Sequence, residues 1–402
     1  MQSGDKPADP NQREPRLLVH ILAYRRPELL RRCCESVART LPPDSRVLVW
    51  LNGPQPENES WLAAWRDPRF EVRHETAQSI AAARSVVLRV RPAEFIYYLD
   101  DDVVVCEGTF DRALATMRRW PDVAVLGGPN LTPPGSSWLQ RLTTALLASR
   151  FTAPGVFRRY RRSEREVVDV DERSLIFCNL LVRVAAVPPG LAFESSLRAG
   201  EETLWLCRLA SQGGRLAYRG DVAVFHERRR SFGAFLKQLF FYGYGRAQQS
   251  FRARESIRVA FLVPALVVAI LPWGFAGPGV GNWGVALSAT YVLLTVAAFV
   301  ESRRHEALPW WSAILFPFVA VLGHLSYGLG FWRGLVAEVT NAGLDRWPWR
   351  GNGCFGRRSI GREPSWGHRV RGDAWSSVDF FQPRQSASRR WAAPHRSEGH
   401  RW

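Results

Sequence analysis

The stretch FIYYLDDDVVV, residues 95–105, places three consecutive aspartates at the end of an apolar run. The apolar run is typical of a buried β-strand. One carboxylate is enough to cap a helix or close a turn, whereas three mutually repelling carboxylates at the mouth of a strand indicate a bound cation. The stretch therefore predicts a strand that leads into a cation-binding site.

Strand and helix patterns alternate before this stretch. They are LLVHILAY (17–24), PELLRRCCESVART (27–40), VLVWLNG (47–53) and TAQSIAAARSVVLRV (76–90). This order predicts an α/β fold with a Rossmann-like, mostly parallel sheet and helices on both faces. Ligands bind beyond the carboxyl ends of such strands. We therefore expect the loops after Ala23, Leu51 and Leu99 to share one rim with the aspartates.

Within the triplet, side chains alternate if the backbone stays extended. Asp100 and Asp102 are then expected on one face and Asp101 on the other. Paired carboxylate oxygens suit Mg²⁺ or Mn²⁺, which usually complete their shell with water and phosphate oxygens. A solvated acidic turn is the alternative interpretation of the same residues.

Two later segments carry further candidate side chains. AGEETLWLCRLASQGG (199–214) predicts a helix with Glu201 and Glu202 in its first turn. Acids at that position either stabilise the helix dipole or take a proton from an attacking hydroxyl. RLAYRGDVAVFHE (215–227) predicts one strand ending at His226, which is either a metal ligand or a surface histidine.

The chain between these motifs gives weaker patterns. Residues 123–130 predict a strand and a turn, and residues 174–183 predict another strand. Residues 133–165 are rich in arginine and irregular, which is typical of a mobile flap.

Composition narrows the classes of partner. The chain has 402 residues and a formal net charge of +17, which suits nucleic acid, an anionic membrane surface or phosphorylated substrates. No nucleic-acid-binding module is recognisable, and the arginines gather around the apolar C-terminal segments and in the tail, so we expect no nucleic-acid partner. The six cysteines form no C-x-x-C pair, which predicts free thiols in a reducing compartment.

The C-terminal part is apolar. Residues 257–332 contain three long runs with almost no charge, each near the ~20 residues that span a bilayer, and tryptophans stand near their ends. We expect two or three transmembrane helices there, although buried helices of a soluble domain are the alternative. Residues 1–15 are polar and show no signal peptide, which predicts a multi-pass protein of the inner (plasma) membrane with the preceding domain in the cytoplasm. Residues 1–15 and the basic tail 346–402 are expected to be disordered.

Together these segments resemble a family 2 glycosyltransferase of GT-A fold over residues 16–250. The likeness rests on LLVHILAYRRPELLRRCCESV, AAARSVV, YLDDDV, GEETLWLCRL and VAVFHERR, in this order and spacing. FYGYGRAQQ and GHLSYGLGFWRG further resemble membrane-attached members of the succinoglycan type, which act in bacterial exopolysaccharide assembly.

The resemblance implies roles for individual residues. Asp100 and Asp102 would hold the diphosphate of a nucleotide sugar through Mg²⁺ or Mn²⁺, with His226 as a further metal ligand or a diphosphate contact. Glu202 would be the general base, with Glu201 as its alternative. The other residues that the resemblance places around the donor are Ala23, Tyr24, Asn52, Arg84 and Asp101.

The implied activity is inverting, metal-dependent transfer of one sugar, of the hexosyltransferase type, from a nucleotide-sugar donor to a membrane-borne, polyprenyl-linked saccharide. Asn52 stands where the family often has Asp, so the nucleotide is open and UDP is only the default; Glu202 also stands where Asp is usual. A Q-x-x-R-W motif is missing from the sequence, which argues against a processive synthase. The alternative is a non-catalytic, membrane-bound nucleotide-binding or scaffold protein of a polysaccharide assembly complex.

Overall fold

A computed structural model describes residues 15–270 and 281–345, except 198 and 254–255. An eight-stranded sheet lies at its centre, in the order β3-β2-β1-β4-β9-β6-β10-β8. The strands are β1 (Leu17–Ala23), β2 (Ser45–Asn52), β3 (Phe70–Glu75), β4 (Phe95–Asp100), β6 (Val123–Gly127), β8 (Glu166–Val168), β9 (Leu180–Arg183) and β10 (Arg215–Arg219).

The first four strands of this order are mutually parallel, whereas β9 is antiparallel to β4 and β6, and β8 is antiparallel to β10. In this register Ala23 is opposite Leu51, and Leu22 is opposite Asp100. The carboxyl ends of β1, β2 and β4 therefore share one rim, as the alternating sequence pattern predicts.

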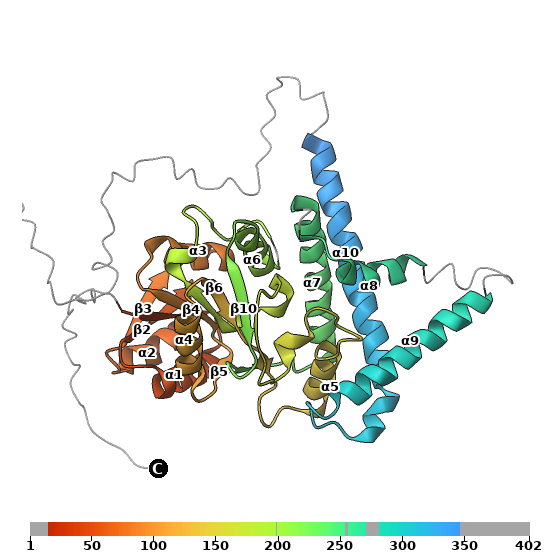
Figure 1. Cartoon of the computed structure of the whole chain (residues 1–402), viewed down its shortest axis with the longest axis horizontal. Helices are drawn as coiled ribbons and strands as arrows, with labels where there is room; N and C mark the ends of the chain where they lie inside the picture. Colours follow the sequence, from red (N-terminus) through yellow and green to blue (C-terminus); the bar gives the residue numbers. More distant parts are fainter. Residues whose placement is uncertain (1–14, 198, 254–255, 271–280, 346–402) are drawn as a thin grey trace, which may run out of the picture.

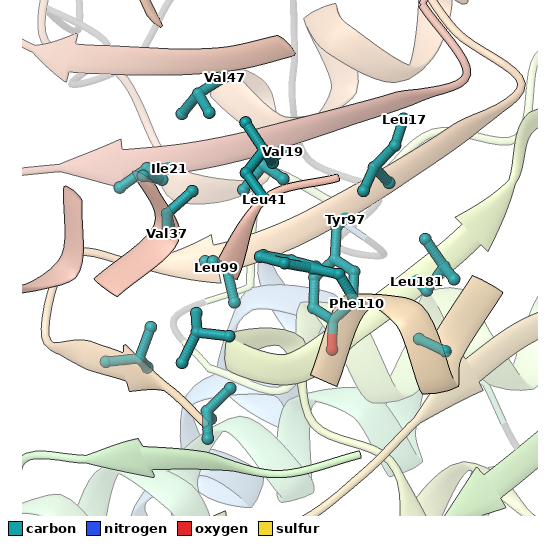
Figure 2. Close-up of a cluster of buried hydrophobic side chains, with 14 of the residues drawn as sticks. Leu17, Val19, Ile21, Val37, Leu41, Val47, Tyr97, Leu99, Phe110 and Leu181 are labelled. Atoms are coloured by element: carbon teal, nitrogen blue, oxygen red, sulfur yellow. The ribbon is translucent and has the colours of Figure 1, made fainter. Parts of the chain in front are cut away.

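The two faces of the sheet bury different sets of side chains because successive residues of a strand point to opposite sides. Val19 and Ile21 pack on one face with helices α1 (Pro27–Thr40), α2 (Pro56–Ala64) and α4 (Thr109–Arg119). Figure 2 shows part of this cluster around Tyr97 and Phe110. Leu18 and Leu22 pack on the other face with α3 (Ile80–Val90) and α6 (Glu201–Ser211). The α/β fold with a mostly parallel sheet and helices on both faces is confirmed.

Two predicted strands are each split between two sheets. A smaller sheet has the order β5-β11-β7, formed by β5 (Val103–Val105), β11 (Val224–His226) and β7 (Asn130–Leu131). Residues 95–105 therefore form β4 and β5 with a turn between them, and residues 215–227 form β10 and β11. Apolar residues flank both breaks, so the pattern reads as one strand interrupted by a few polar residues, and periodicity alone does not show that the second part joins another sheet.

Two irregular regions also differ from expectation. Residues 133–165 contain helix α5 (Trp138–Leu147), which begins with a capping box between Ser137 and Gln140, and the 3-10 turn η1 (Phe157–Tyr160). The flap prediction is wrong for α5, whose apolar face is buried in a cluster with the C-terminal helices. The strand expected over 174–183 is limited to β9; before it lie the 3-10 turns η2 (Glu172–Ser174) and η3 (Phe177–Asn179), and η4 (Val184–Ala186) follows.

The C-terminal helices lie beside the α/β part (Figure 1). They are α7 (Phe232–Arg252), α8 (Val259–Ile270), α9 (Gly281–Ser302), η7 (Trp310–Ile314) and α10 (Phe316–Asp345). Helices α7 and α10 run side by side and approach closely at glycines. A Cβ atom at Gly243 would clash with the carbonyl oxygen of Tyr327, and one at Gly330 would clash with that of Phe240. Only glycine permits backbones to come this close.

The two or three transmembrane helices expected over 257–332 are not found in the described part of the chain. No helix there combines the length and the apolar character that a bilayer crossing requires. Residues 271–280 of the first expected run, and the expected disordered segments 1–14 and 346–402, lie outside the described residues.

Candidate active site

The three aspartates lie where β4 ends. Asp100 is the last residue of β4, Asp101 and Asp102 form a turn, and β5 begins at Val103. Side-chain alternation requires an extended backbone, so it does not apply beyond Asp100. Asp101 is fully buried, and its Oδ2 accepts a hydrogen bond from the backbone N–H of Tyr24, 2.9 Å away in the loop after β1.

Arg26 lies against this turn. Its guanidinium donates one hydrogen bond to Asp101 Oδ1 and another to Asp102 Oδ2. Burial raises the pKa of Asp101 to about 7 although Arg26 opposes the shift. Burial alone would also raise the pKa of Asp102, but His226 and Arg26 outweigh it and hold that pKa well below its usual range. Arg26 therefore offsets part of the negative charge of this turn.

His226 connects Asp102 with Asp100. Strand β11 pairs with β5 so that His226 is opposite Val103, directly after the turn. Its Nε2 lies 3.1 Å from Asp102 Oδ1. Ligand atoms of His226, Asp100 and Cys178 all lie within 4.8 Å of one another. The structure thus brings together the three side chains that the sequence nominates as metal ligands.

These residues fit a divalent cation. Asp102 Oδ1 is buried, and no donor in the described part of the chain makes a well-directed hydrogen bond to it. Two carboxylates and an imidazole form an oxygen and nitrogen set suited to Mn²⁺ or Mg²⁺. Cys178 is a poorer ligand for these ions, because burial raises the pKa of its thiol and thiolates prefer softer metals.

Arg84 links the aspartates to the acidic helix. It is buried on α3, and its Nη2 lies 2.6 Å from Asp100 Oδ1 while its Nη1 lies 3.3 Å from Glu201 Oε1. Its guanidinium also lies over the ring of Phe177, 4.1 Å from the centroid. Arg84, which the sequence places near the nucleotide, thus fixes the spacing between the two carboxylate clusters.

Glu201 and Glu202 begin helix α6 and face different surroundings. Gly200, with φ of 84°, lets the chain turn into the helix. Glu201 points towards Arg84, and burial together with the charge of Glu202 raises its pKa. Glu202 instead lines a cavity of about 160 Å³ between the α/β part and helices α7, α8 and α10. The side chains of successive helical residues point in directions about 100° apart, so Glu201 can face Arg84 while Glu202 faces the cavity.

The loops after β1 and β2 complete the rim. Tyr24 is 48% exposed, so its ring is available to a ligand, whereas Ala23 is buried and its carbonyl accepts a hydrogen bond from Gln55. Asn52 is buried, and its side-chain amide makes two 2.9 Å hydrogen bonds with the backbone of Gln78. Asn52 therefore anchors the loop that leads to α3, and its side-chain amide is engaged there.

A second hollow of about 580 Å³ lies at the opposite edge of the sheet, where β1 and β4 begin. Arg16 and Glu94 line it, and none of the carboxylates described above does. Because ligands of such sheets bind at the carboxyl ends of the strands, the smaller cavity beside Glu202 is the relevant one.

Sequence reasoning missed Arg26 and Cys178. Arg26 stands in the RRP turn after β1, seventy-six residues from Asp102, and only the strand register brings the two together. Its position on the predicted rim was the available signal. Cys178 lies in a 3-10 turn inside a segment that reads as a strand, so no pattern marked it.

Comparison with known proteins identifies the α/β part. Residues 18–187 match the family model "Glycosyl transferase family 2". The chain contains a glycosyltransferase family 2 domain. This confirms the resemblance at the level of the family; the succinoglycan subgroup stays a prediction. A search of curated proteins gives no significant match.

Two solved structures are similar to this chain over most of their length. Mannosyltransferase PcManGT from Pyrobaculum calidifontis, in complex with GDP-Man and Mn²⁺, is 15% identical with a TM-score of 0.48, over 81% of this chain and 90% of that one. TarS residues 1–349 from S. aureus, in complex with UDP-GlcNAc, is 14% identical with a TM-score of 0.40, over 79% of this chain and 91% of that one.

Proposed function

We propose that the protein is a metal-dependent, inverting glycosyltransferase that moves one sugar from a nucleotide donor to a hydroxyl of a membrane-borne saccharide. The observation that carries the proposal is that Asp100, Asp102 and His226 come together in a chain whose residues 18–187 match a family 2 domain, and that Arg84 links Asp100 to Glu201, next to Glu202. A UDP-sugar is the default donor, and a polyprenyl-linked saccharide is the proposed acceptor.

The chain's own residues divide the work. Asp100, Asp102 and His226 would hold the cation, and the chemistry that it supplies when bound is neutralisation of the donor's diphosphate. Tyr24 offers its exposed ring to the nucleotide base. Arg84 keeps Asp100 and Glu201 at a fixed separation, so the distance between the donor-binding and acceptor-binding sides of the site stays constant.

The transfer is a single displacement. The acceptor oxygen forms a bond to the anomeric carbon while the bond from that carbon to the diphosphate oxygen breaks. The electron pair of the broken bond leaves with the nucleoside diphosphate, and the acceptor proton passes to Glu202. Burial and the charge of Glu202 raise the pKa of Glu201, so Glu202 is the proposed base of the pair.

We further propose that the protein works at the inner (plasma) membrane, with the α/β domain in the cytoplasm. Helices α8–α10 expose large apolar side chains, among them Val259, Leu293, Ile314 and Phe318. An exposed apolar surface of this kind is characteristic of membrane or protein contact. Attachment there would hold the cleft close to a lipid-linked acceptor in cell-surface polysaccharide synthesis.

Release of nucleoside diphosphate tests the proposal. Purified protein in detergent is incubated with a panel of nucleotide sugars, with and without Mn²⁺ and acceptor lipids. We expect Mn²⁺-dependent release from one donor class, and Glu202→Gln should lower transfer roughly 10²–10⁴-fold while donor binding persists. Glu164→Gln, which changes an exposed glutamate of a surface loop, is the matched control. A chain that binds a nucleotide sugar but never cleaves it would support the scaffold alternative.

A further inference from the structure

The cavity beside Glu202 has two kinds of wall. Apolar side chains from α5, α7 and α8 contribute to one kind, including Leu146, Leu239 and Phe261. Two arginines, Arg159 of η1 and Arg246 of α7, also line it. Its volume of about 160 Å³ is below the ~300 Å³ of a typical small-molecule site, which suits a small group such as a phosphate with a few carbons.

The charge of the two arginines is not balanced by an ion pair. Arg159 is buried and donates to the backbone carbonyls of Arg173 and Glu172, at 2.7 and 3.0 Å. Arg246 donates to Gln249 Oε1 at 2.7 Å. Among the described residues, no carboxylate lies within 4.0 Å of either guanidinium. Glu202, which lines the same cavity, and Glu172 act on Arg246 only through space, and Glu172 is paired with Arg258.

An uncompensated guanidinium in an apolar wall is costly. The Arg246 guanidinium lies 3.9 Å from the centroid of Phe261, and burial lowers its pKa. Arginine presents a fork of donors that matches phosphate oxygens. A phosphate entering the cavity would supply the ion-pair partner that the two guanidinium groups lack.

The apolar wall continues to the surface through one helix. On α8, Ala260, Phe261 and Pro264 face the cavity, whereas Val263 and Leu266 are about half exposed. A hydrocarbon chain attached to a phosphate in the cavity would therefore pass along α8 onto the exposed apolar surface of the C-terminal helices. The cavity thus offers a charged end and an apolar exit.

We propose that this cavity binds the phosphate and the first carbons of an amphiphilic, phosphate-bearing acceptor, held by Arg246 and Arg159 with Glu202 at the reacting side. The inference rests on the proposed function for the role of Glu202, and it adds the acceptor's chemical class and the residues that read it. No bond is made or broken in this binding step.

Binding of octyl phosphate below its micelle concentration tests this inference by isothermal titration of the full chain. Wild type should bind octyl phosphate at least ~10-fold more tightly than 1-octanol or inorganic phosphate. The reason is that 1-octanol lacks the phosphate for the two arginines and inorganic phosphate lacks the hydrocarbon chain for the apolar wall. Arg246→Gln should remove this preference, and Arg246→Lys should retain part of it. Arg230→Gln removes the same charge from a side chain that is 84% exposed just before α7, and should leave binding unchanged.

Equal affinity of wild type for octyl phosphate and 1-octanol would overturn the inference, whatever the variants do. So would an undiminished preference in folded Arg246→Gln. Binding of UDP or GDP with Mn²⁺, measured in the same samples, separates the two proposals. Intact nucleotide binding without octyl phosphate binding refutes only the cavity assignment, and the reverse result refutes only the donor site.

Discussion

Arg26 holds Asp102, one of the two aspartates proposed to bind the metal, so removal of Arg26 should strengthen metal binding. In Arg26→Gln, Asp101 and Asp102 lose their guanidinium partner, and Asp102 Oδ2 becomes available together with Oδ1. The variant also makes the site more negative. Both effects should tighten the binding of Mn²⁺ to the variant.

The magnitude follows from the exposure of the contact. The Arg26 side chain is 38% exposed, while those of Asp101 and Asp102 are 0% and 8% exposed. The strength of such a charge-assisted hydrogen bond lies between that of an exposed ion pair and that of a buried one. Displacing the guanidinium from Asp102 therefore costs about 1–2 kcal/mol. The expected gain in Mn²⁺ affinity is therefore about 5–30-fold.

Electron paramagnetic resonance of free Mn²⁺ measures this directly, without donor or turnover. Arg31→Gln serves as the control, because Arg31 lies on α1 just after Arg26, is 59% exposed and pairs with Glu35. The reasoning is refuted if Arg26→Gln binds Mn²⁺ no more tightly than wild type, or if Arg31→Gln gains as much.

Two further predictions concern stability. Gly243→Ala should destabilise the fold by about 2 kcal/mol or more, because its methyl group would collide with the backbone of α10. Gly233→Ala, in open space at the start of the same helix, should stabilise the fold by about 0.5–1 kcal/mol. Thermal melts of both variants check this, and equal melting temperatures would contradict the close packing of α7 and α10. Burial raises the pKa of Glu306 from 4.5 to about 7, so its stabilising effect is complete below about pH 4.5 and is lost as pH rises through 7. Glu306→Gln should then match wild type at pH 5 and exceed it by up to about 3 kcal/mol at pH 8. Burial also acts to raise the pKa of Glu301, but hydrogen bonds from Arg150 and Ser149 outweigh it and lower that pKa, so Glu301→Gln should instead destabilise the fold at pH 8. Denaturant titrations of both variants at both pH values measure these changes. A change of the same sign in Glu306→Gln and Glu301→Gln at pH 8 would refute the opposite pKa shifts.

The parts of the fold that sequence predicts well are those fixed by local periodicity. Strands β1, β2 and β4 and helices α1 and α3 appear where the alternating pattern places them. The parts that it misses depend on contacts between distant residues. The break after Asp100 exists because β5 leaves to pair with β11, more than a hundred residues later, and nothing within residues 95–105 specifies that partner. Helix α5 did carry a local signal, the Ser137–Gln140 capping box.

The candidate site shows the same division. The resemblance nominates Asp100, Asp102 and His226, and the structure brings them together. It does not reveal that Arg26 holds two of the aspartates or that Asn52 is engaged by Gln78, because both depend on side-chain partners chosen only when the chain has folded. The distinct surroundings of Glu201 and Glu202 likewise follow from where α6 lies between the sheet and α7.

The central claim is that Asp102 helps to hold a divalent cation that binds the nucleotide diphosphate. Titration of UDP and GDP into wild type and Asp102→Asn, each with and without Mn²⁺, tests it most directly, with circular dichroism to confirm folding. The account predicts that Mn²⁺ tightens nucleotide binding by wild type at least ~10-fold and has no effect on Asp102→Asn. Equal enhancement in the two proteins, or nucleotide binding by wild type that ignores Mn²⁺, would contradict it.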